Sequence, residues 1–362
     1  MNFKSALAVL VCGLGVASMS AQSQEQLQHA TFISNGTFLG TVPSIADQLA
    51  NGTFIPAENI QGEVNPKRAD TPKGVPGKGA LGGPDPLMER QVAHAGSRMA
   101  TDPLITWECA TSGATPSDPT GAVGPDHFVN SWNSAFRIWD KDGNSMTPAA
   151  SLATIWSGES SGDPIVMYDS YADRFFISQF AFPASFLVAV STGPDPVNDD
   201  WYTYEFSVDQ FPDYPKWSLW SDGYYVTANK NSGNAGNTEV IYAIERDLIL
   251  AGEASPQMVG FPLPDIVTAG FYSPLAFNGN GSVPPPAGNV PVTYVQDNTW
   301  AGVSSDHLKV WTVNVDWSSP ASSTISDPEI IETEPFDGWF DGGSFSNLPQ
   351  PSGPDIDCLQ AT

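Results

Sequence analysis

The chain has 362 residues, with 40 acidic residues against 14 lysines and arginines, a formal net charge of −26 and a pI near 4.1. This balance excludes nucleic acid and anionic membrane surfaces as direct partners, because phosphate binding needs clustered Lys and Arg. Hydrophobic residues make up 41% of the chain, enough for a sizeable core. The 33 glycines and 32 prolines argue against a helical bundle or a coiled coil.

The N-terminus has the order of a secretory signal peptide. Lys4 gives a positive start, the run from Ala6 to Val16 is apolar, and small residues follow as far as Ala21. We therefore predict cleavage after Ala21 and a secreted protein, either extracellular or periplasmic. No later stretch has the length and apolarity of a membrane span, and the run 180–190 is more typical of a buried strand.

Removal of the signal peptide leaves two cysteines, Cys109 and Cys358. In an oxidising compartment an even pair predicts one disulfide, which would tie the first and last segments of the main domain together. The alternative is two buried thiols, because sequence spacing does not establish the required distance between the Cα atoms.

Charge divides the mature chain into two parts. Residues 22–100 carry six basic and seven acidic residues, whereas residues 101–362 carry seven basic and thirty-three acidic residues. The upstream part contains a Pro/Gly/Lys stretch at 72–79 that is typical of linkers. We predict a signal peptide at 1–21, a poorly structured linker or propeptide-like leader at 22–100, and a repeat domain at 101–362.

Two short apolar patches interrupt the predicted leader, at 30–42 and 45–55. Each is long enough to form a strand or a helix that packs on the main domain.

Three segments of the acidic part repeat with a period of nearly fifty residues. Each begins with an aspartate, at Asp126, Asp173 and Asp222, so the spacings are 47 and 49 residues. An aromatic and β-branched run follows each aspartate, and a second such run follows the first. The second runs lie at 135–139, 186–190 and 239–244, and a fourth, less regular unit has runs at 290–295 and 308–315.

The repeat predicts three or four short strands per unit, joined by Gly, Asp and Asn turns. One such sheet cannot bury both of its faces, so neighbouring units must stack, and a period in the forties is close to that of a β-propeller blade. Residues 101–362 leave room for about five or more blades. The final residues do not resemble a closing strand, so this chain can hold an incomplete ring. One short helix is expected at 245–251, closed by Gly252.

Three strings carry a resemblance to a known group of proteins. They are GAVGPDHFV at Gly121–Val129, GDPIVMYD at Gly162–Asp169 and FPDYP at Phe211–Pro215. They resemble motifs of a poorly characterised group of exported bacterial β-propeller proteins, over roughly residues 105–350. The resemblance implies export and the propeller fold, and it implies no reaction.

The strongest candidate site is a set of three aspartates at the start of the first strand of successive units, Asp118, Asp163 and Asp213. In a propeller the first strand of each blade lines the central channel, and a ring of carboxylates there would bind Ca²⁺. Alternatively, two carboxylates facing one cavity would act as acid and base on a glycosidic bond. A structural role is also open, because Asp before Pro fixes a turn by accepting backbone N–H bonds.

The second set of aspartates, at positions 126, 173 and 222, is expected to cap turns between strands. Asp140–Asn144 resembles the start of a calcium loop, but Ser151 stands where that loop needs Glu, so Asp142-Gly143 favours a hairpin. The stretch Gly158–Gly162 matches the G-x-S-x-G pattern of serine hydrolases. A β run follows it instead of a helix, so we reject that interpretation.

Histidines and tryptophans supply weaker candidates. His127 and His307 each follow an aspartate, and isolated surface or turn positions are favoured over a metal site or a general base. The tryptophans of the repeat region are expected to fill gaps between blades, and exposed ones would offer flat faces to sugar rings.

These observations predict a secreted, non-catalytic binding or scaffold domain, stabilised by Ca²⁺, that binds a carbohydrate or a protein at an acidic channel mouth. The alternative is a polysaccharide-degrading hydrolase or lyase that uses paired carboxylates from the same ring. A third hypothesis is a surface-display module whose ligand site lies in a further C-terminal part.

Overall fold

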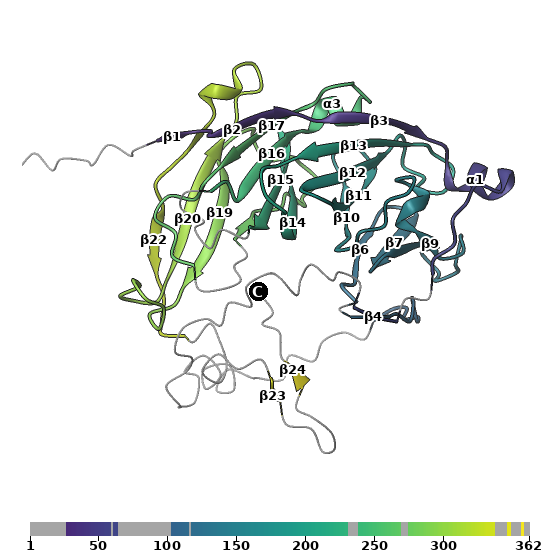
Figure 1. Cartoon of the computed structure of the whole chain (residues 1–362), viewed down its shortest axis with the longest axis horizontal. Helices are drawn as coiled ribbons and strands as arrows, with labels where there is room; N and C mark the ends of the chain where they lie inside the picture. The colour runs from purple at the N-terminus through teal and green to yellow at the C-terminus, as the bar shows by residue number, and fades with distance from the viewer. Residues whose placement is uncertain are drawn as a thin grey trace, which may run out of the picture.

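The computed structural model describes residues 27–58, 61–63, 103–115, 117–230, 238–268, 274–336, 346–348 and 356–357. Within them, four antiparallel sheets fan out side by side along an arc, as the blades of a β-propeller do (Figure 1). The predicted all-β propeller fold is therefore confirmed. These are the four blades of the described residues, and the blade count of the whole chain stays a prediction.

Each blade is built from strands that are consecutive in the sequence. Blade 1 contains β6 (Thr120–Val123), β7 (His127–Trp132), β8 (Ala135–Asp140) and β9 (Ala150–Ser151). Blade 2 contains β10 (Ile165–Asp169), β11 (Arg174–Ala181), β12 (Ser185–Ser191) and β13 (Trp201–Ser207). Blade 3 contains β14 (Asp213–Leu219), β15 (Gly223–Asn229), β16 (Ile241–Glu245) and β17 (Gln257–Phe261).

Blade 4 has an interrupted outer part. Its strands are β18 (Leu275–Ala276), β19 (Val290–Gln296), β20 (His307–Asn314), β21 (Thr324–Ile325) and β22 (Glu329–Glu332), and the last two both pair with β20. Outside the blades, β4 (Gln61–Glu63) pairs in parallel with β5 (Gly113–Thr115), and β23 (Ser346–Leu348) pairs with β24 (Ile356–Asp357).

The predicted repeat coincides with the blades. Asp126, Asp173 and Asp222 each stand directly before the second strand of a blade, and the second apolar runs fall in β8, β12 and β16. The expected short helix is α3 (Arg246–Leu250), and Gly252 follows it in the left-handed region with a φ of 72°. The repeat is visible in the sequence because blades 1 to 3 each place an aspartate directly before a strand that packs between neighbouring blades.

The hydrophobic core lies between blades. In β11, Phe175 packs in the cluster shared with blade 1, whereas its neighbour Phe176 packs in the cluster shared with blade 3. Successive side chains of a strand point to opposite faces, so a central blade buries both. Trp217 packs against Phe176 and Phe186, and Trp311 is fully buried between blades 3 and 4. Large aromatics thus fill gaps between blades, as expected.

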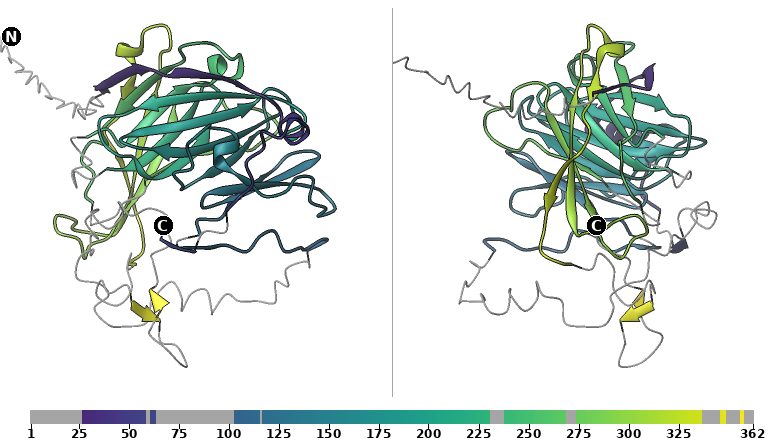
Figure 2. Two further views of the ribbon diagram at one scale, coloured as in Figure 1. Left: turned by 45° about the vertical axis from the view of Figure 1, so that its right-hand side comes forward. Right: turned by 90° about the vertical axis from the view of Figure 1, so that its left-hand side faces the viewer.

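A segment near the N-terminus runs along the outer edge of the blades, and we call residues 28–57 the strap (Figures 1 and 2). Its strand β1 (Gln28–His29) pairs with β21, β2 (Phe32–Asn35) pairs with β17, and β3 (Thr37–Val42) pairs with β13. Further along, the Ser151 amide donates to the Ile55 carbonyl at 2.9 Å, beside a bridge between Pro56 and Ala150. The strap therefore adds to the outer edge of each blade, from the fourth to the first.

The strap also contains the helix α1 (Ile45–Asn51), which the local sequence specifies at both ends. The Ser44 hydroxyl accepts a hydrogen bond from the Asp47 amide at 3.1 Å, and Gly52 closes the helix with a φ of 73°. Ile45 is fully buried in the core between blades 1 and 2, so the helix is anchored by its first residue. The boundary near residue 100 thus does not separate the strap from the blades, because the strap completes their sheets.

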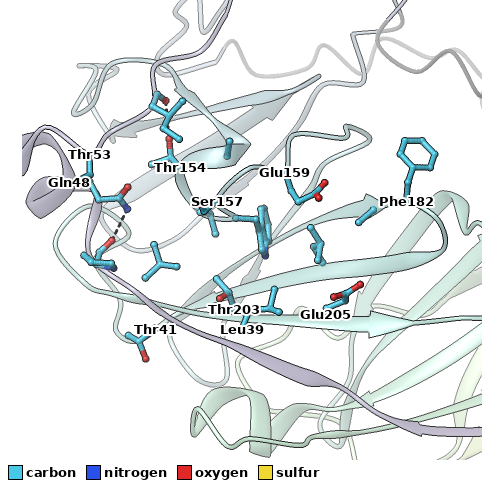
Figure 3. Close-up of a pocket in the computed structure, with 18 residues that line it drawn as sticks. Leu39, Thr41, Gln48, Thr53, Thr154, Ser157, Glu159, Phe182, Thr203 and Glu205 are labelled. Carbon is cyan, nitrogen blue, oxygen red and sulfur yellow. Dashed lines mark hydrogen bonds between the residues drawn. The ribbon is translucent and has the colours of Figure 1, made fainter.

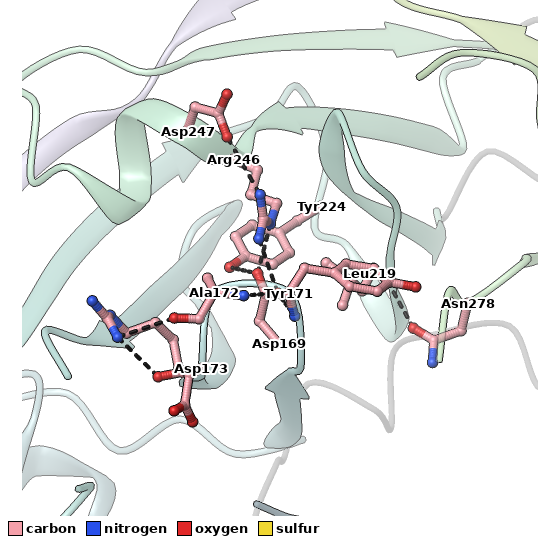
Figure 4. A network of polar contacts seen from close by, with 10 residues as sticks. Asp169, Tyr171, Ala172, Asp173, Leu219, Tyr224, Arg246, Asp247 and Asn278 are labelled. Atoms are coloured by element: carbon pink, nitrogen blue, oxygen red, sulfur yellow. Dashed lines mark hydrogen bonds and ion pairs between the residues drawn. The ribbon is translucent and has the colours of Figure 1, made fainter. Parts of the chain in front are cut away.

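A buried polar cluster joins blades 2 and 3 (Figure 4). The Asp169 carboxylate, at the end of β10, accepts hydrogen bonds from the Arg246 guanidinium, the Tyr224 hydroxyl and the backbone amides of Tyr171 and Ala172. Because Tyr224 and Arg246 belong to β15 and α3, one carboxylate fixes both a hairpin of blade 2 and the packing of blade 3 on it.

Several sequence predictions lie outside the described residues. They include the signal peptide and its cleavage site, Cys358 and most of the predicted leader. The disulfide between Cys109 and Cys358 therefore stays a prediction. Among the described residues, no helix has the length and apolarity needed to cross a membrane.

Candidate functional site

A cavity of about 680 Å³ lies where the strap crosses from blade 2 to blade 1 (Figure 3). The strap supplies one wall, with Leu39, Thr41 and Gln48 among its residues. Residues 153–159 of blade 1 supply a second wall, and the outer strands of blade 2 supply the floor. The strap wall is fixed to both blades, because the Thr154 hydroxyl donates to the Ile55 carbonyl at 2.9 Å and the Thr203 hydroxyl donates to the Gly40 carbonyl at 2.9 Å.

Two glutamates line this pocket, Glu159 from the loop after blade 1 and Glu205 from β13 (Figure 3). Glu205 is half-buried, and its Oε1 accepts a hydrogen bond from the Ser185 hydroxyl at 2.7 Å. Glu159 is exposed, and its Oε2 lies 3.4 Å from the Ser161 hydroxyl. Within the described part of the chain neither carboxylate forms an ion pair, so each meets the pocket with its negative charge uncompensated.

The loop that carries Glu159 is held from beneath by a buried side chain, Gln179 of β11, which is 0% exposed. Its Oε1 accepts from the amides of Ser161 and Gly162 at 2.8 and 3.3 Å, and its Nε2 donates to the Glu159 carbonyl at 3.2 Å. One amide side chain thus satisfies three backbone groups of a segment with no regular structure. The backbone position of Glu159 is therefore fixed by blade 2.

Two aromatic side chains complete the pocket. Trp156 is 3% exposed, and its indole N–H has no hydrogen-bond acceptor among the described residues. A buried donor without a partner costs free energy. Phe182 is 37% exposed, and its ring stacks on Phe211 with centroids 4.8 Å apart and planes 10° apart. The stacking fixes the ring of Phe182 beside the pocket.

The three strand-start aspartates do not line this pocket, and they do not form one group of ligands. Among the described residues there is no cluster of three or more His, Cys, Asp or Glu that could hold a metal ion. Asp118 and Asp163 are linked instead through Asn133, whose Nδ2 donates to Asp118 Oδ2 at 2.6 Å and whose Oδ1 accepts from the Asp163 amide at 2.7 Å. Calcium binding at these aspartates stays a prediction.

The third aspartate, Asp213, also occupies a different backbone position from the other two. Asp118 and Asp163 precede a proline and have positive φ values of 39° and 46°, but in blade 3 the equivalent residue is Tyr214, with a φ of 53°. Asp213 lies one position earlier, and its Oδ1 accepts from the Tyr214 amide at 2.9 Å. A break in the pairing of β14 with β15 between Asp213 and Lys216 accompanies this shift. Matching the repeats by their aspartates therefore paired Asp213 with Asp118 and Asp163, although Asp213 has a different position in the backbone of its turn.

The turn aspartates Asp173 and Asp222 lie at their turns, but they bond tyrosine hydroxyls: Asp173, with a φ of 57°, accepts from Tyr168 at 2.5 Å, and Asp222 accepts from Tyr225 at 3.1 Å. In blade 2 the carboxylate that caps the turn amides is Asp169 instead. The hairpin after β8 is confirmed, because Asp140 Oδ1 accepts from the amides of Asp142 and Asn144 at 2.9 and 2.8 Å. Hydrogen bonds from Asn144, first from its side chain, hold the pKa of Asp140 below its ordinary value.

The two histidines begin strands and are buried, which corrects the expectation of surface or turn positions. His127 is 8% exposed at the start of β7, and its Nε2 lies 3.6 Å from Asp195 Oδ1. His307 is 7% exposed at the start of β20, and its Nδ1 lies 2.7 Å from the Ser305 carbonyl oxygen. The strands bury them because their side chains face the packed side of each sheet.

Sequence reasoning missed the residues of the pocket. Glu159 lies inside the G-x-S-x-G match, which was correctly rejected because β10 follows it and not a helix. Trp156 was one of many tryptophans, and Glu205 is a lone acidic residue in a β run. The one sequence feature that points to the pocket is the acidic residue Glu205 within a largely apolar strand. This feature does not indicate what the carboxylate faces.

Comparison with known proteins gives weak similarity only. No family model matches the chain, and no curated protein matches it. An α-L-arabinofuranosidase from Lactobacillus brevis aligns at 17% identity over 59% of this chain and 73% of that chain, with a TM-score of 0.33. A protein assigned as an exo-β-1,3-galactanase from Bifidobacterium bifidum aligns at 9% identity over 62% and 91%, with a TM-score of 0.30. At these TM-scores the similarity says nothing about the site.

Proposed function

We propose that the protein is a secreted carbohydrate-binding propeller and that the pocket beneath the strap is its binding site. The observation that carries this proposal is a pocket of about 680 Å³ that is lined by two carboxylates, Glu159 and Glu205, together with the threonines Thr41 and Thr53. Carboxylates and hydroxyls gathered in one concave, partly apolar site suit a ligand with many hydroxyl groups.

The remaining lining suits the same ligand class. The carboxylates of Glu159 and Glu205 accept hydrogen bonds, as sugar hydroxyls require. Phe182, which is 37% exposed, adds apolar surface to the lining. Sugars present both kinds of surface at once, and the pocket offers a partner to each. Export, predicted from the N-terminal sequence, would bring the protein to extracellular polysaccharides.

Binding of an oligosaccharide panel by the full mature protein and by a Glu205→Gln variant tests this proposal. Glutamine keeps the shape of the side chain and removes the carboxylate charge. We expect the unmodified protein to bind at least one oligosaccharide, and the variant to lose roughly tenfold in affinity, because a charge-assisted hydrogen bond from a sugar hydroxyl is lost. Equal affinity of the two proteins, or no binding across the panel, would contradict the proposal.

Hydrolysis of a glycosidic bond is a second candidate function, favoured by one specific observation. Two carboxylates, Glu159 and Glu205, line a single pocket, and most glycoside hydrolases use such a pair as acid and as base or nucleophile. These are not the strand-start aspartates that the sequence suggested for this chemistry. Release of reducing ends from polysaccharides that is lost in both Glu159→Gln and Glu205→Gln would establish this activity. If the protein binds a polysaccharide but releases no reducing ends from it, the result supports binding and not hydrolysis.

A further inference from the structure

The charge of the pocket restricts the sugars that it can hold. Of the residues that line it, Glu159 and Glu205 are the charged ones, and the described lining contains no lysine, arginine or histidine. Among the described residues, the two carboxylates accept hydrogen bonds from the hydroxyls of Ser161 and Ser185. A hydroxyl stabilises a carboxylate but leaves its charge in place. The pocket therefore presents net negative charge to any ligand.

The surroundings strengthen this charge instead of cancelling it. Residues 101–362 carry thirty-three acidic against seven basic residues, so the wider surface is also negative. Two carboxylates that face a partly enclosed cavity are screened less by salt than carboxylates on an open surface. Bringing a third negative group into the pocket would cost free energy, whereas a cation would relieve the repulsion.

Both glutamates have a fixed backbone position at the edge of the pocket. Glu205 lies within β13, paired on one side with β12 and on the other with β3 of the strap. Glu159 is fixed through its backbone by Gln179.

We infer that this pocket selects sugars that carry a positively charged amino group and rejects acidic sugars such as uronates. The inference rests on the proposed carbohydrate-binding function and names its ligand class. An ammonium group would donate charge-assisted hydrogen bonds to Glu159 or Glu205, which are about twice as strong as neutral ones. A uronate would place its own carboxylate against them.

Three short oligosaccharides of equal length test this inference by titration calorimetry: trimers of glucosamine, of N-acetylglucosamine and of galacturonic acid. At about pH 6 amines of ordinary pKa are protonated. We expect the glucosamine trimer to bind about tenfold more tightly than the N-acetylated trimer, and the galacturonate trimer to bind least. The preference should shrink as salt is raised from about 0.05 to about 0.5 M.

Matched double variants separate the pocket from the general charge of the protein. Glu159→Gln with Glu205→Gln removes two pocket charges, and Glu253→Gln with Glu329→Gln removes two exposed charges that do not line the pocket. The first pair should abolish the preference for the glucosamine trimer, and the second should keep it. Equal affinity for the aminated and N-acetylated trimers, or equal loss of preference in both double variants, would overturn the inference while leaving sugar binding intact. If no trimer or longer oligosaccharide binds, the proposed function itself fails.

Discussion

Asp169 and Arg246 form a bidentate ion pair between blades 2 and 3, with 2.6 Å between Oδ2 and Nε and 3.0 Å between Oδ1 and Nη2. Both side chains are buried, Asp169 to 1% exposure. The Tyr224 hydroxyl donates to the same carboxylate at 2.8 Å. Every oxygen of the carboxylate is thus occupied, which is the condition under which a buried ion pair stabilises a fold.

Replacement of this carboxylate should therefore destabilise the propeller. Asp169→Asn leaves a buried guanidinium without its charge partner, and we expect a loss of about 3 kcal/mol in the free energy of unfolding. Urea unfolding at pH 7 measures it. Asp247→Asn is the matched control, because Asp247 is 85% exposed and lies 3.3 Å from Nη1 of the same Arg246. If the two variants were equally stable, the pair would contribute nothing to the packing of the blades.

Alkaline pH should unfold the protein through its buried tyrosines. Burial, more than the nearby Asp169 and Asp222 carboxylates, raises the pKa of Tyr224 and Tyr225 well above the ordinary value. A raised pKa in the folded state gives stability that is complete below the unfolded pKa, about 10, and is lost as the pH rises above it. Urea midpoints should be level from about pH 8 to 9 and fall above about 10. Tyr225→Phe should make that fall shallower, and an unchanged slope would argue against Tyr225.

If Asn133 is the partner that holds the strand-start aspartates, replacing Asn133 should destabilise the protein more than removing calcium does. Its amide links Asp118 to Asp163, so Asn133→Leu should lower the free energy of unfolding by about 1–3 kcal/mol. Thermal melts with EDTA and then with added Ca²⁺ distinguish the two roles. A calcium-dependent rise in Tm that disappears in Asp118→Asn would instead support the metal site predicted from the sequence.

The strap should stabilise the blades through one face only. Phe32 packs edge-on against Tyr242 with ring centroids 5.7 Å apart, whereas the adjacent Ile33 is 47% exposed. Phe32→Ala should cost about 2–3 kcal/mol, and Ile33→Ala should change stability by less than about 0.5 kcal/mol. Thermal or urea unfolding measures both. Equal small effects would mean that strand pairing, and not packing, holds the strap.

Gln179 should act on ligand binding through Glu159. Gln179→Leu removes the three hydrogen bonds that hold the 159–162 loop, so affinity for the bound oligosaccharide should fall roughly tenfold. A double-mutant cycle with Glu159→Gln isolates the positioning role, because a residue that works only through Glu159 gives non-additive losses. Additive losses would show that Gln179 supports the fold and does not position the carboxylate.

The sequence alone determined the repeat, and through it the fold class. Each unit places an aspartate, such as Asp173, in a tight turn, and follows it with a strand that is apolar on both faces, such as β11. Those are local requirements of a blade packed between two others, so they recur at a fixed spacing. The same local logic predicted the hairpin after Asp140 and the helix closed by Gly252, because turn and cap residues act on their own backbone.

Only the tertiary structure decided where the chain could bind anything. The strap pairs with strands far away in the sequence, and a β-strand pattern does not say which sheet edge it will join. Glu159 lies in the loop after blade 1 and Glu205 lies in blade 2, and strap residues line the pocket that they share. Asp118 and Asp163 were visible as a pair, but their link through Asn133 was not. Local sequence specifies turns and strands, whereas a site depends on contacts between segments that the sequence does not bring together.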